Sequence, residues 1–522
     1  MVSPATSAML TGVGGYDCDV AVIGSGFGGS VAALRAAEAG RSVIVCEQGN
    51  RVTPEDLQRG ADSTRALLWE PALGLSGYFR QTVLRHVTVV GGVGVGGGSL
   101  VYAAVLLRPD AEVLAAPGWA ATGIDWHAEL EPHFATAAQM LGRQRNPHRG
   151  IQDEWLQQAA AAMGAADTYG ATWQGIEFDD CVQCGQCITG CPYGAKRSTD
   201  LTYLRRAEDL GATVRTRSRV ESLVPLGERG DHGWKVVLSD PVDRRSISSL
   251  ITREVVLAAG VLGTTGLLLS CRDRWGTMPD LSPRLGDHVR TNSEAFAAVL
   301  HPPGTDVTRG STISSDFYPD ERTHITNNRF PKSYSFMKWY LSPAVTGGDQ
   351  RERRRATMAA MLRHPRESFA NVWPRDWHRG TPGLTVMQHD DNEIRLELSK
   401  GPLGRRGSWR LASRTAAGVP PIPTHLPQAD AAGAAVARAS GGRAYTTVLE
   451  SLLGIGATAH ILGGAVMAPT ADTGVVDADH RVFGFDNLRI MDGSVVPENI
   501  GVNPSWTITA LAERAAERWL AG

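Results

Sequence analysis

The sequence predicts an α/β protein, with a Rossmann-like dinucleotide-binding domain into which a second domain of different composition is inserted. The first observation is a βαβ opening: a β-branched run at 16–24 ends in glycine, helical residues follow to Ala39, and a second strand covers 42–48. The second is the return, from about residue 454 onward, of the glycine-rich, alternating pattern of the first part. The third is the proline-richer composition of residues 295–450, between these two parts.

The opening motif has the features of a dinucleotide site. Residues 24–29, GSGFGG, follow the predicted strand and begin the predicted helix. Gly24 would make the tight turn, Gly26 would let the backbone approach a pyrophosphate, and Gly29 would let the helix pack close to the strand. Glu47 ends the second strand, where an acid accepts hydrogen bonds from ribose hydroxyls, and an acid there argues against a 2′-phosphate.

Three further segments favour FAD over NAD. Residues 91–99, GGVGVGGGS, are too rich in glycine for a plain strand, and we expect their backbone to lie against an isoalloxazine ring; a flexible surface loop is the alternative. The turn VLAAG at 256–260 resembles a second approach to the dinucleotide. Asp492 and Gly493 follow a predicted strand at Leu488–Met491 and could bind ribityl hydroxyls, although an Asp-Gly pair alone is usually only a turn.

The elements between these motifs alternate between helix and strand. Residues 115–165 have a helical pattern, with an amphipathic stretch at His127–Leu141. A helix at Tyr203–Leu210 precedes a strand at Thr213–Arg217, and residues 254–270 form a strand, a tight turn and a helix. In the proline-richer region, an arginine-rich stretch is most simply a solvated helix face, with contact to a membrane surface as the alternative; it contains Arg351, Arg353, Arg354 and Arg355.

Four of the seven cysteines lie within eleven residues, in a loop at 178–198. Their spacing, C-x2-C-x2-C-x3-C followed by proline, is that of bacterial ferredoxin ligands, so we predict that they hold an iron–sulfur cluster of the [4Fe–4S] type. The alternatives are a structural zinc loop, disulfides or free thiols; zinc fits poorly because it prefers two CxxC pairs with a long spacer. Cys271 is a candidate for a remote ligand in place of the fourth thiolate. The predicted metal ligands are Cys181, Cys184, Cys187 and Cys191.

Composition restricts the class of protein. Hydrophobic residues make up 42% and charged residues 20%, which is ordinary for a soluble globular enzyme. The net charge of -2 gives no overall field that favours nucleic acid or anionic lipid, so we expect no nucleic-acid partner. No apolar run reaches the roughly 18 residues of a transmembrane segment, and the first residues lack a basic n-region. We therefore predict a cytoplasmic protein.

Several stretches resemble the glucose-methanol-choline (GMC) oxidoreductases, and most closely their actinobacterial cholesterol-oxidase-like branch. They are YDCDVAVIGSGFGGSVAALRAAEAG, GGVGVGGGSLVYAAVLLRP, the cysteine loop CVQCGQCITGCPYGAKRSTDLTYL, EVVLAAGVLGTTGLLL, LSPRLGDHVRTNSEA, HILGGAVM and VFGFDNLRIMDGSVVPENIGVNPSWTITALAERAAE. The resemblance covers nearly the whole chain and is weakest over about 300–445. It implies a Rossmann-like FAD-binding domain with an inserted α+β substrate-binding domain built on an antiparallel sheet.

The resemblance also implies domain limits and cofactor contacts. The first part of the FAD-binding domain would cover 15–295, the substrate-binding or cap domain 296–453, and the C-terminal part of the FAD-binding domain, with the active-site residues, 454–522. The expected FAD contacts are Gly24, Gly26, Phe27, Gly29, Glu47, Gly94, Gly98, Ser99, Val220, Ala259, Gly260, Asp492, Gly493, Asn503 and Pro504.

In this family a His and an Asn sit at the flavin face beside the substrate hydroxyl, and the motifs place His460 and Asn503 there. Alcohol oxidation requires removal of the hydroxyl proton as a hydride leaves carbon for flavin N5. A histidine can accept that proton, whereas an amide can only orient the alcohol and polarise the reacting groups. A helix at Pro504–Glu513 would begin near the flavin, where its N-terminus stabilises negative charge. The extra carboxylate of some relatives cannot be placed; we interpret His389 and Glu393 as structural, with substrate contacts as the alternative.

The expected function is oxidation of an apolar, steroid- or terpenoid-like alcohol, with electrons passing to O2 or to an electron-carrier protein. Two alternatives belong to other classes. One is a non-redox isomerase or cyclase in which His460 moves protons on the same scaffold. The other is an electron-transfer module that relays electrons for a partner; the intact pair of His460 and Asn503 argues against it.

Overall fold

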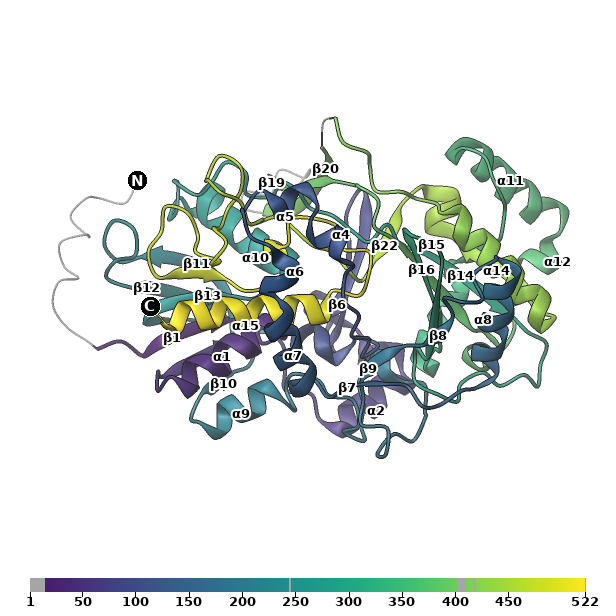
Figure 1. The fold of residues 1–522 in the computed structure, drawn as a ribbon, viewed down its shortest axis with the longest axis horizontal. Coiled ribbons are helices and arrows are strands. Elements are labelled where there is room, and N and C mark those ends of the chain that lie inside the picture. Colours follow the sequence, from purple (N-terminus) through teal and green to yellow (C-terminus); the bar gives the residue numbers. More distant parts are fainter. Residues whose placement is uncertain (1–14, 244–245, 401–408, 417, 522) are drawn as a thin grey trace.

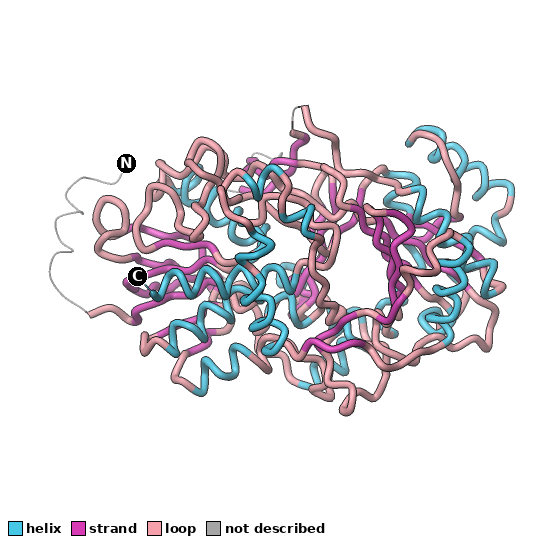
Figure 2. Tube along the Cα trace, viewed as in Figure 1, coloured by secondary structure: helices cyan, strands magenta, loops and turns pink. Residues whose placement is uncertain are grey.

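The computed structural model describes residues 15–243, 246–400, 409–416 and 418–521. Its strands gather mainly in two seven-stranded sheets, one in each half of the molecule, with loops between them (Figure 2). The first sheet has the order β10-β2-β1-β13-β12-β11, with β23 also paired to β13. Its strands are β1 Cys18–Ile23, β2 Val43–Cys46, β10 Thr213–Arg215, β11 Arg219–Pro225, β12 Trp234–Ser239, β13 Ile247–Leu257 and β23 Leu488–Ile490.

The core of the first sheet is parallel, as the βαβ opening predicts. β1 pairs in parallel with both β2 and β13, and the helix α1 (Phe27–Glu38) connects β1 to β2. The last segment of the chain completes this domain, because β23 pairs in parallel with β13 and α15 (Ser505–Ala521) packs along α1 (Figure 1). A bidentate salt bridge between Arg35 and Glu513, with N–O distances of 2.7 and 2.8 Å, joins these helices. The two ends of the chain therefore form one domain.

Smaller helices surround this domain: α7 Glu131–Met140, α9 Tyr203–Asp209 and α10 Gly260–Leu269. The amphipathic stretch predicted at His127–Leu141 is divided into α6 (Trp126–Glu129) and α7, with Leu130 as the residue between them. A separate three-stranded sheet of β5 (Phe79–Val83), β6 (Val87–Gly92) and β22 (Gly456–Thr458) lies beside the glycine-rich turn that follows β6. This sheet brings the segment before His460 next to that turn.

The second sheet is antiparallel, as expected for an α+β insertion, with the order β17-β21-β14-β18-β16-β15-β8. The helices α8 (Ile151–Ala162) and α14 (Pro427–Ser440) pack together against it (Figure 1). Both α8 and β8 precede residue 296, so part of the earlier segment joins the second sheet. Its strands are β8 Gly170–Ala171, β14 Ala295–Leu300, β15 Ser315–Asp320, β16 Thr323–Asn328, β17 Leu341–Pro343, β18 Gly383–Gln388 and β21 Arg443–Thr447.

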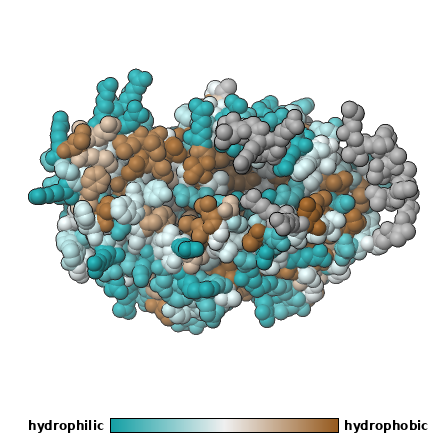
Figure 3. All heavy atoms as spheres, turned by 180° about the vertical axis from the view of Figure 1, so that it is seen from behind, coloured by the Kyte–Doolittle hydropathy of each residue, from teal (hydrophilic) through white to brown (hydrophobic). Residues whose placement is uncertain are grey.

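The arginine-rich stretch forms the helix α11 (Gln350–Arg363). Three of its arginines, at 351, 354 and 355, are exposed, as a solvated face requires. Arg353 is the exception, because its side chain is 1% exposed and pairs with Asp430 at 3.2 Å. Met358 and Leu362 are exposed on the same helix, and apolar atoms gather toward this end of the molecule (Figure 3). No helix in the described ranges has the length and apolar character needed to cross a membrane.

Candidate active site

The opening glycines divide into two groups according to what surrounds them. A Cβ added at Gly24 would lie 2.4 Å from the carbonyl oxygen of Ala258, and one at Gly28 would lie 1.5 Å from that of Met491. These positions require glycine because backbone from neighbouring strands approaches them. At Gly26, by contrast, the nearest atom to an added Cβ is 3.9 Å away. The fold itself does not demand glycine there.

Gly98 repeats this pattern, since an added Cβ would meet nothing nearer than the Phe27 ring at 3.9 Å. Gly26 is also the N-cap of α1, and no side chain caps that helix. Uncapped amides at a helix N-terminus bind anions such as a pyrophosphate. Open space over Gly26 and Gly98, beside an uncapped helix, therefore fits a dinucleotide cofactor.

Glu47 is held at the end of β2 by its own neighbours. The Ser25 hydroxyl donates to its carboxylate at 2.6 Å, and the backbone N–H of Gly49 donates at 2.9 Å. Burial raises the pKa of Glu47, while these hydrogen bonds act in the opposite direction. The carboxylate is thus fixed in position beside Gly24, which follows β1.

The side chain of Ser99 holds the glycine-rich turn through two hydrogen bonds. The Ser99 hydroxyl donates to the carbonyl of Gly96 at 2.7 Å and accepts from the backbone N–H of Thr199 at 3.0 Å. Gly94 precedes this turn with a φ of +147°, and Phe27 packs edge-on against Tyr102 at its far end. Val220, another expected contact, lies in β11 opposite Leu238 of β12.

Asp492 connects the end of β23 to the start of α10. Its carboxylate accepts from the N–H of Gly260 at 2.9 Å, from the Thr264 hydroxyl at 2.5 Å and from the N–H of Ser494 at 2.8 Å. Burial raises its pKa, and these donors lower it. Ala259 is the N-cap of α10, and Gly493 begins a short 3-10 turn. Asp492 therefore orients the second turn of the predicted cofactor site, a role that the ribityl prediction did not include.

His460 and Asn503 come together although 43 positions separate them. His460 lies just after β22, and Asn503 and Pro504 immediately precede α15, which begins at Ser505 and not at Pro504. The Asn503 amide donates to His460 Nε2 at 3.0 Å. Asn292 holds the loop in place by donating to the carbonyl of Val502 at 2.7 Å.

A buried carboxylate completes the group. Glu294 Oε1 lies 3.1 Å from His460 Nδ1, and the N–H of Ala459 and the hydroxyl of Thr458 both donate to this carboxylate. Burial opposes ionisation of Glu294, but the charge of the neighbouring His460, together with these donors, holds its pKa below the ordinary value. Glu294 is thus ionised beside the imidazole. Glu294 was not among the residues predicted from the sequence. Its only indication there is its position in LSPRLGDHVRTNSEA, one of the stretches that resemble the family.

These contacts define what the imidazole can do. With a proton on Nδ1 facing Glu294, the Nε2 lone pair of His460 points at the Asn503 amide. Asn503 Oδ1 is buried and has no hydrogen-bond partner among the described residues. Because buried polar atoms are normally paired, this oxygen is suited to receive a donor from a ligand. The group can therefore orient a hydroxyl and accept its proton.

The two other sequence candidates, Glu393 and His389, contact other residues of the protein. Glu393 lies 3.0 Å from the ring of His288 and 3.5 Å from the guanidinium of Arg290. His389 packs against Gly501 in the loop that leads to Asn503. Both agree with the structural interpretation of these residues.

The four clustered cysteines line one cavity, together with Ile176 and Lys196. All seven cysteines of the chain are described and unpaired, which excludes the disulfide alternative in this structure. Cys271 does not line the cavity; its thiol is buried in the FAD-domain core, where the N–H of Leu223 donates to it at 3.3 Å. The prediction of Cys271 as a remote ligand is therefore wrong.

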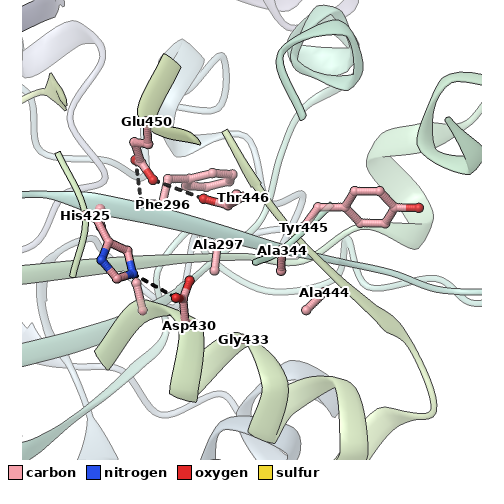
Figure 4. Close-up of a pocket in the computed structure, with 12 residues that line it drawn as sticks. Phe296, Ala297, Ala344, His425, Asp430, Gly433, Ala444, Tyr445, Thr446 and Glu450 are labelled. Atoms are coloured by element: carbon pink, nitrogen blue, oxygen red, sulfur yellow. Dashed lines mark hydrogen bonds and ion pairs between the residues drawn. The ribbon is translucent and has the colours of Figure 1, made fainter. Parts of the chain in front are cut away.

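A second pocket lies between the antiparallel sheet and α14 (Figure 4). Glu450 accepts from the backbone N–H of Phe296 and from the Thr446 hydroxyl, both at 3.1 Å. Burial raises the pKa of Glu450 to about 7. Asp430, also at this pocket, lies 2.8 Å from His425. Glu294, His460 and Asn503 do not line this pocket.

Comparison with known proteins finds the same family along most of the chain. Two family models, both described as GMC oxidoreductase, match residues 22–289 and 346–512. A cholesterol oxidase from Mycobacterium tuberculosis (strain ATCC 25618 / H37Rv) is 38% identical, over 96% of this chain and 91% of its own length. A cholesterol oxidase from Acinetobacter baumannii is 34% identical, over 96% of this chain and 94% of its own length.

Solved structures resemble the fold at lower identity. Pyridoxine 4-oxidase from Mesorbium loti matches with a TM-score of 0.63 and 18% identity, covering 97% of this chain and 100% of that chain. A fungal aryl-alcohol oxidase matches with a TM-score of 0.59 and 17% identity, covering 97% of this chain and 99% of that chain. These matches support the fold described above.

Proposed function

Since the chain belongs to the GMC oxidoreductase family, we propose that it oxidises the hydroxyl-bearing carbon of an apolar, steroid- or terpenoid-like alcohol. The observation that carries this proposal is the group formed by Glu294, His460 and Asn503. Bound FAD would supply the hydride acceptor. The glycines at 26 and 98 and the uncapped start of α1 would hold it.

In the proposed reaction, the substrate hydroxyl lies at His460 Nε2 and Asn503. Nε2 takes the hydroxyl proton, and the ionised Glu294 stabilises the positive charge that the imidazole then carries. Asn503 has no basic group, so its amide orients the alcohol oxygen and stabilises the charge that develops on it. Each side chain thus acts at a different atom of the alcohol or of the imidazole.

The apolar surroundings of this group support the choice of substrate. Glu294 directly precedes β14, whose Phe296 packs against a buried aromatic cluster that also contains Phe330, Tyr334 and Trp377. Leu100, at the end of the glycine-rich turn, belongs to the same cluster. Apolar side chains therefore extend from the cofactor turn to the strand beside Glu294. Most of these side chains are packed in the core, so a hydrocarbon skeleton would contact the partly buried members such as Phe296, with its hydroxyl end at His460.

The names of the relatives support O2 as electron acceptor, because two cholesterol oxidases match over almost the full chain. In air, each alcohol oxidised would then yield one carbonyl product and one H2O2. The isomerase or cyclase alternative requires no net loss of hydrogen, and no contact around His460 distinguishes it. Product analysis separates the two.

The test incubates the FAD-loaded enzyme with a 3β-hydroxysteroid, a linear terpenoid alcohol, a sugar and ethanol. We expect one apolar alcohol to give a product lighter by two hydrogens, with an equal amount of H2O2 in air. A product of unchanged mass would support the isomerase or cyclase alternative and contradict the proposal. Turnover of the sugar or ethanol alone would contradict the substrate class.

A further inference from the structure

The cavity of the cysteine loop has no part in the reaction proposed above. It is lined by the thiols of Cys181, Cys184, Cys187 and Cys191. We propose that this cavity is a binding site for a [4Fe–4S] cluster with these four thiolates as its ligands. The site is separate from the group around His460.

The loop backbone turns so that all four thiols face one space. Gly185 and Gly190 have φ values of +71° and +88°, which reverse the chain between successive cysteines. A Cβ at Gly185 would lie 2.4 Å from the carbonyl of Thr308, so the loop is pressed against the second domain. The N–H of Gly310 donates to the carbonyl of Gln183 at 2.9 Å and fixes that contact. The convergence of the thiols is therefore built into the backbone.

The spacing of the four cysteines along the sequence favours a cluster over a single ion. Within the described part of the chain, no three His, Cys, Asp or Glu side chains lie close enough together to hold one metal ion. A zinc ion needs its thiolates at about 2.3 Å from one centre. In a cubane each thiolate binds a different iron, so the four sulfurs lie farther apart and surround a larger volume. The C-x2-C-x2-C-x3-C spacing, together with the shared cavity, matches the cubane.

Donors around the thiols fit ligands that carry charge. The N–H of Thr312 donates to Cys187 Sγ at 3.5 Å. Hydrogen bonds to the sulfurs are one of the means by which proteins stabilise iron–sulfur clusters.

Lys196 supplies a buried positive charge at the same cavity. Its ammonium donates to the carbonyls of Cys187 at 2.8 Å, Leu100 at 2.8 Å and Tyr102 at 3.1 Å. Its hydrogen-bond partners are all neutral carbonyls, and the carboxyl of Asp200 interacts with its charge electrostatically. A cubane with four thiolates carries net negative charge, which offsets that of Lys196.

The experiment measures metal content in the full-length protein, produced with added iron and purified without oxygen. We expect about four irons and about four acid-labile sulfides per chain, with zinc well below one. FAD is quantified separately in the supernatant of denatured protein, because its absorbance overlaps that of a cluster. Protein that holds less than one iron per chain, even after incubation with iron and sulfide, would overturn the proposal, as would one zinc per chain.

Serine variants test which thiols are ligands. We expect Cys184→Ser and Cys187→Ser each to lose most of the iron and sulfide. Cys18→Ser and Cys271→Ser remove buried thiols outside the cavity, so both should keep the content of the unmodified protein. A ligand variant that retains FAD but loses iron shows that the loss is not general unfolding. If the iron content is equal in all four variants, these thiols do not hold it and the proposal fails.

Discussion

At the scale of single residues, His460 has its two ring nitrogens in contact with different partners. Nδ1 faces Glu294, and Nε2 faces the Asn503 amide. This arrangement fixes which nitrogen carries the lone pair, because a carboxylate favours the proton on the nitrogen that faces it. The two partners therefore have separable effects on catalysis.

Replacing either side chain that would touch the alcohol should slow the chemical step. We expect His460→Ala to lower kcat by about 10²- to 10⁴-fold and Asn503→Ala by about 10²- to 10³-fold, the range for loss of a positioned base or of an oxyanion donor. FAD content and thermal stability should change little. Steady-state kinetics with the best apolar alcohol measures both values, and unchanged kcat in Asn503→Ala would remove that residue from the proposed site.

Glu294→Gln tests the carboxylate, which acts through the imidazole. We expect kcat to fall roughly tenfold to a hundredfold with KM nearly unchanged, a part of the general-base contribution. The acidic limb of the kcat/KM profile should move to lower pH, because the carboxylate no longer favours the protonated imidazole. Glu393→Gln is the matched control, since Glu393 lies 3.0 Å from His288 in the same kind of pair. Equal effects of the two variants would indicate a structural role for Glu294.

At the level of elements, two glycines at the start of α1 serve different needs: Gly28 is required by the fold, and Gly26 by the proposed cofactor. Gly26→Ala should leave the fold intact, because the atoms nearest to the added Cβ are 3.9 Å away. The same substitution should raise the Kd for FAD at least about tenfold. Gly28→Ala should destabilise the protein itself, since its Cβ would lie 1.5 Å from the carbonyl of Met491. Flavin titration and thermal unfolding of both variants measure this difference. Full FAD affinity in Gly26→Ala would contradict the position proposed for the cofactor.

Glu450, between the antiparallel sheet and α14, makes stability depend on pH. Its pKa is about 7 in the folded protein, against an ordinary 4.5, so the folded state binds the proton more tightly than the unfolded state. Stability should therefore decrease as pH rises from about 4.5 through 7. Glu450→Gln can keep the contacts with Phe296 and Thr446, and should raise the free energy of unfolding at pH 8 by about 1–3 kcal/mol.

Denaturant unfolding at pH 5 and pH 8 measures the increase in the free energy of unfolding of Glu450→Gln. This increase should be small at pH 5. Asp430→Asn is the control in the same pocket. It removes the charge that pairs with Arg353 and His425, so it should destabilise the protein at pH 8. A destabilised Glu450→Gln at pH 8 would show that the buried carboxylate is not costly there.

At the scale of the whole molecule, the parts predicted from sequence are those encoded by local motifs. The GSGFGG turn, its strand and helix, and Glu47 occur within 30 residues, so spacing alone places them. The four clustered cysteines also needed no tertiary information to be grouped. His460 and Asn503 required the family resemblance, because their 3.0 Å contact joins two segments that share no local pattern.

The parts missed are contacts over long separations in the sequence. Glu294 lies 166 positions before His460, and no spacing rule connects an acid at the start of a strand with a histidine after another. The pairing of β8 with β15 and the packing of α8 on α14 similarly join residues before 296 to the second sheet. The sequence alone predicts that Arg353 is solvated like the three arginines beside it, because its partner Asp430 lies far away in the sequence. Packing, and not local propensity, decided each of these.

In the proposed reaction, a bound flavin receives a hydride from an alcohol held by His460 and Asn503. Rapid mixing of the oxygen-free, FAD-loaded enzyme with the best apolar alcohol tests it directly, through the loss of oxidised-flavin absorbance. We expect complete bleaching that is slower when the hydroxyl-bearing carbon carries deuterium, and at least about a hundredfold slower in His460→Ala. Flavin that stays oxidised with every alcohol, or that bleaches at the same rate in His460→Ala, would contradict it.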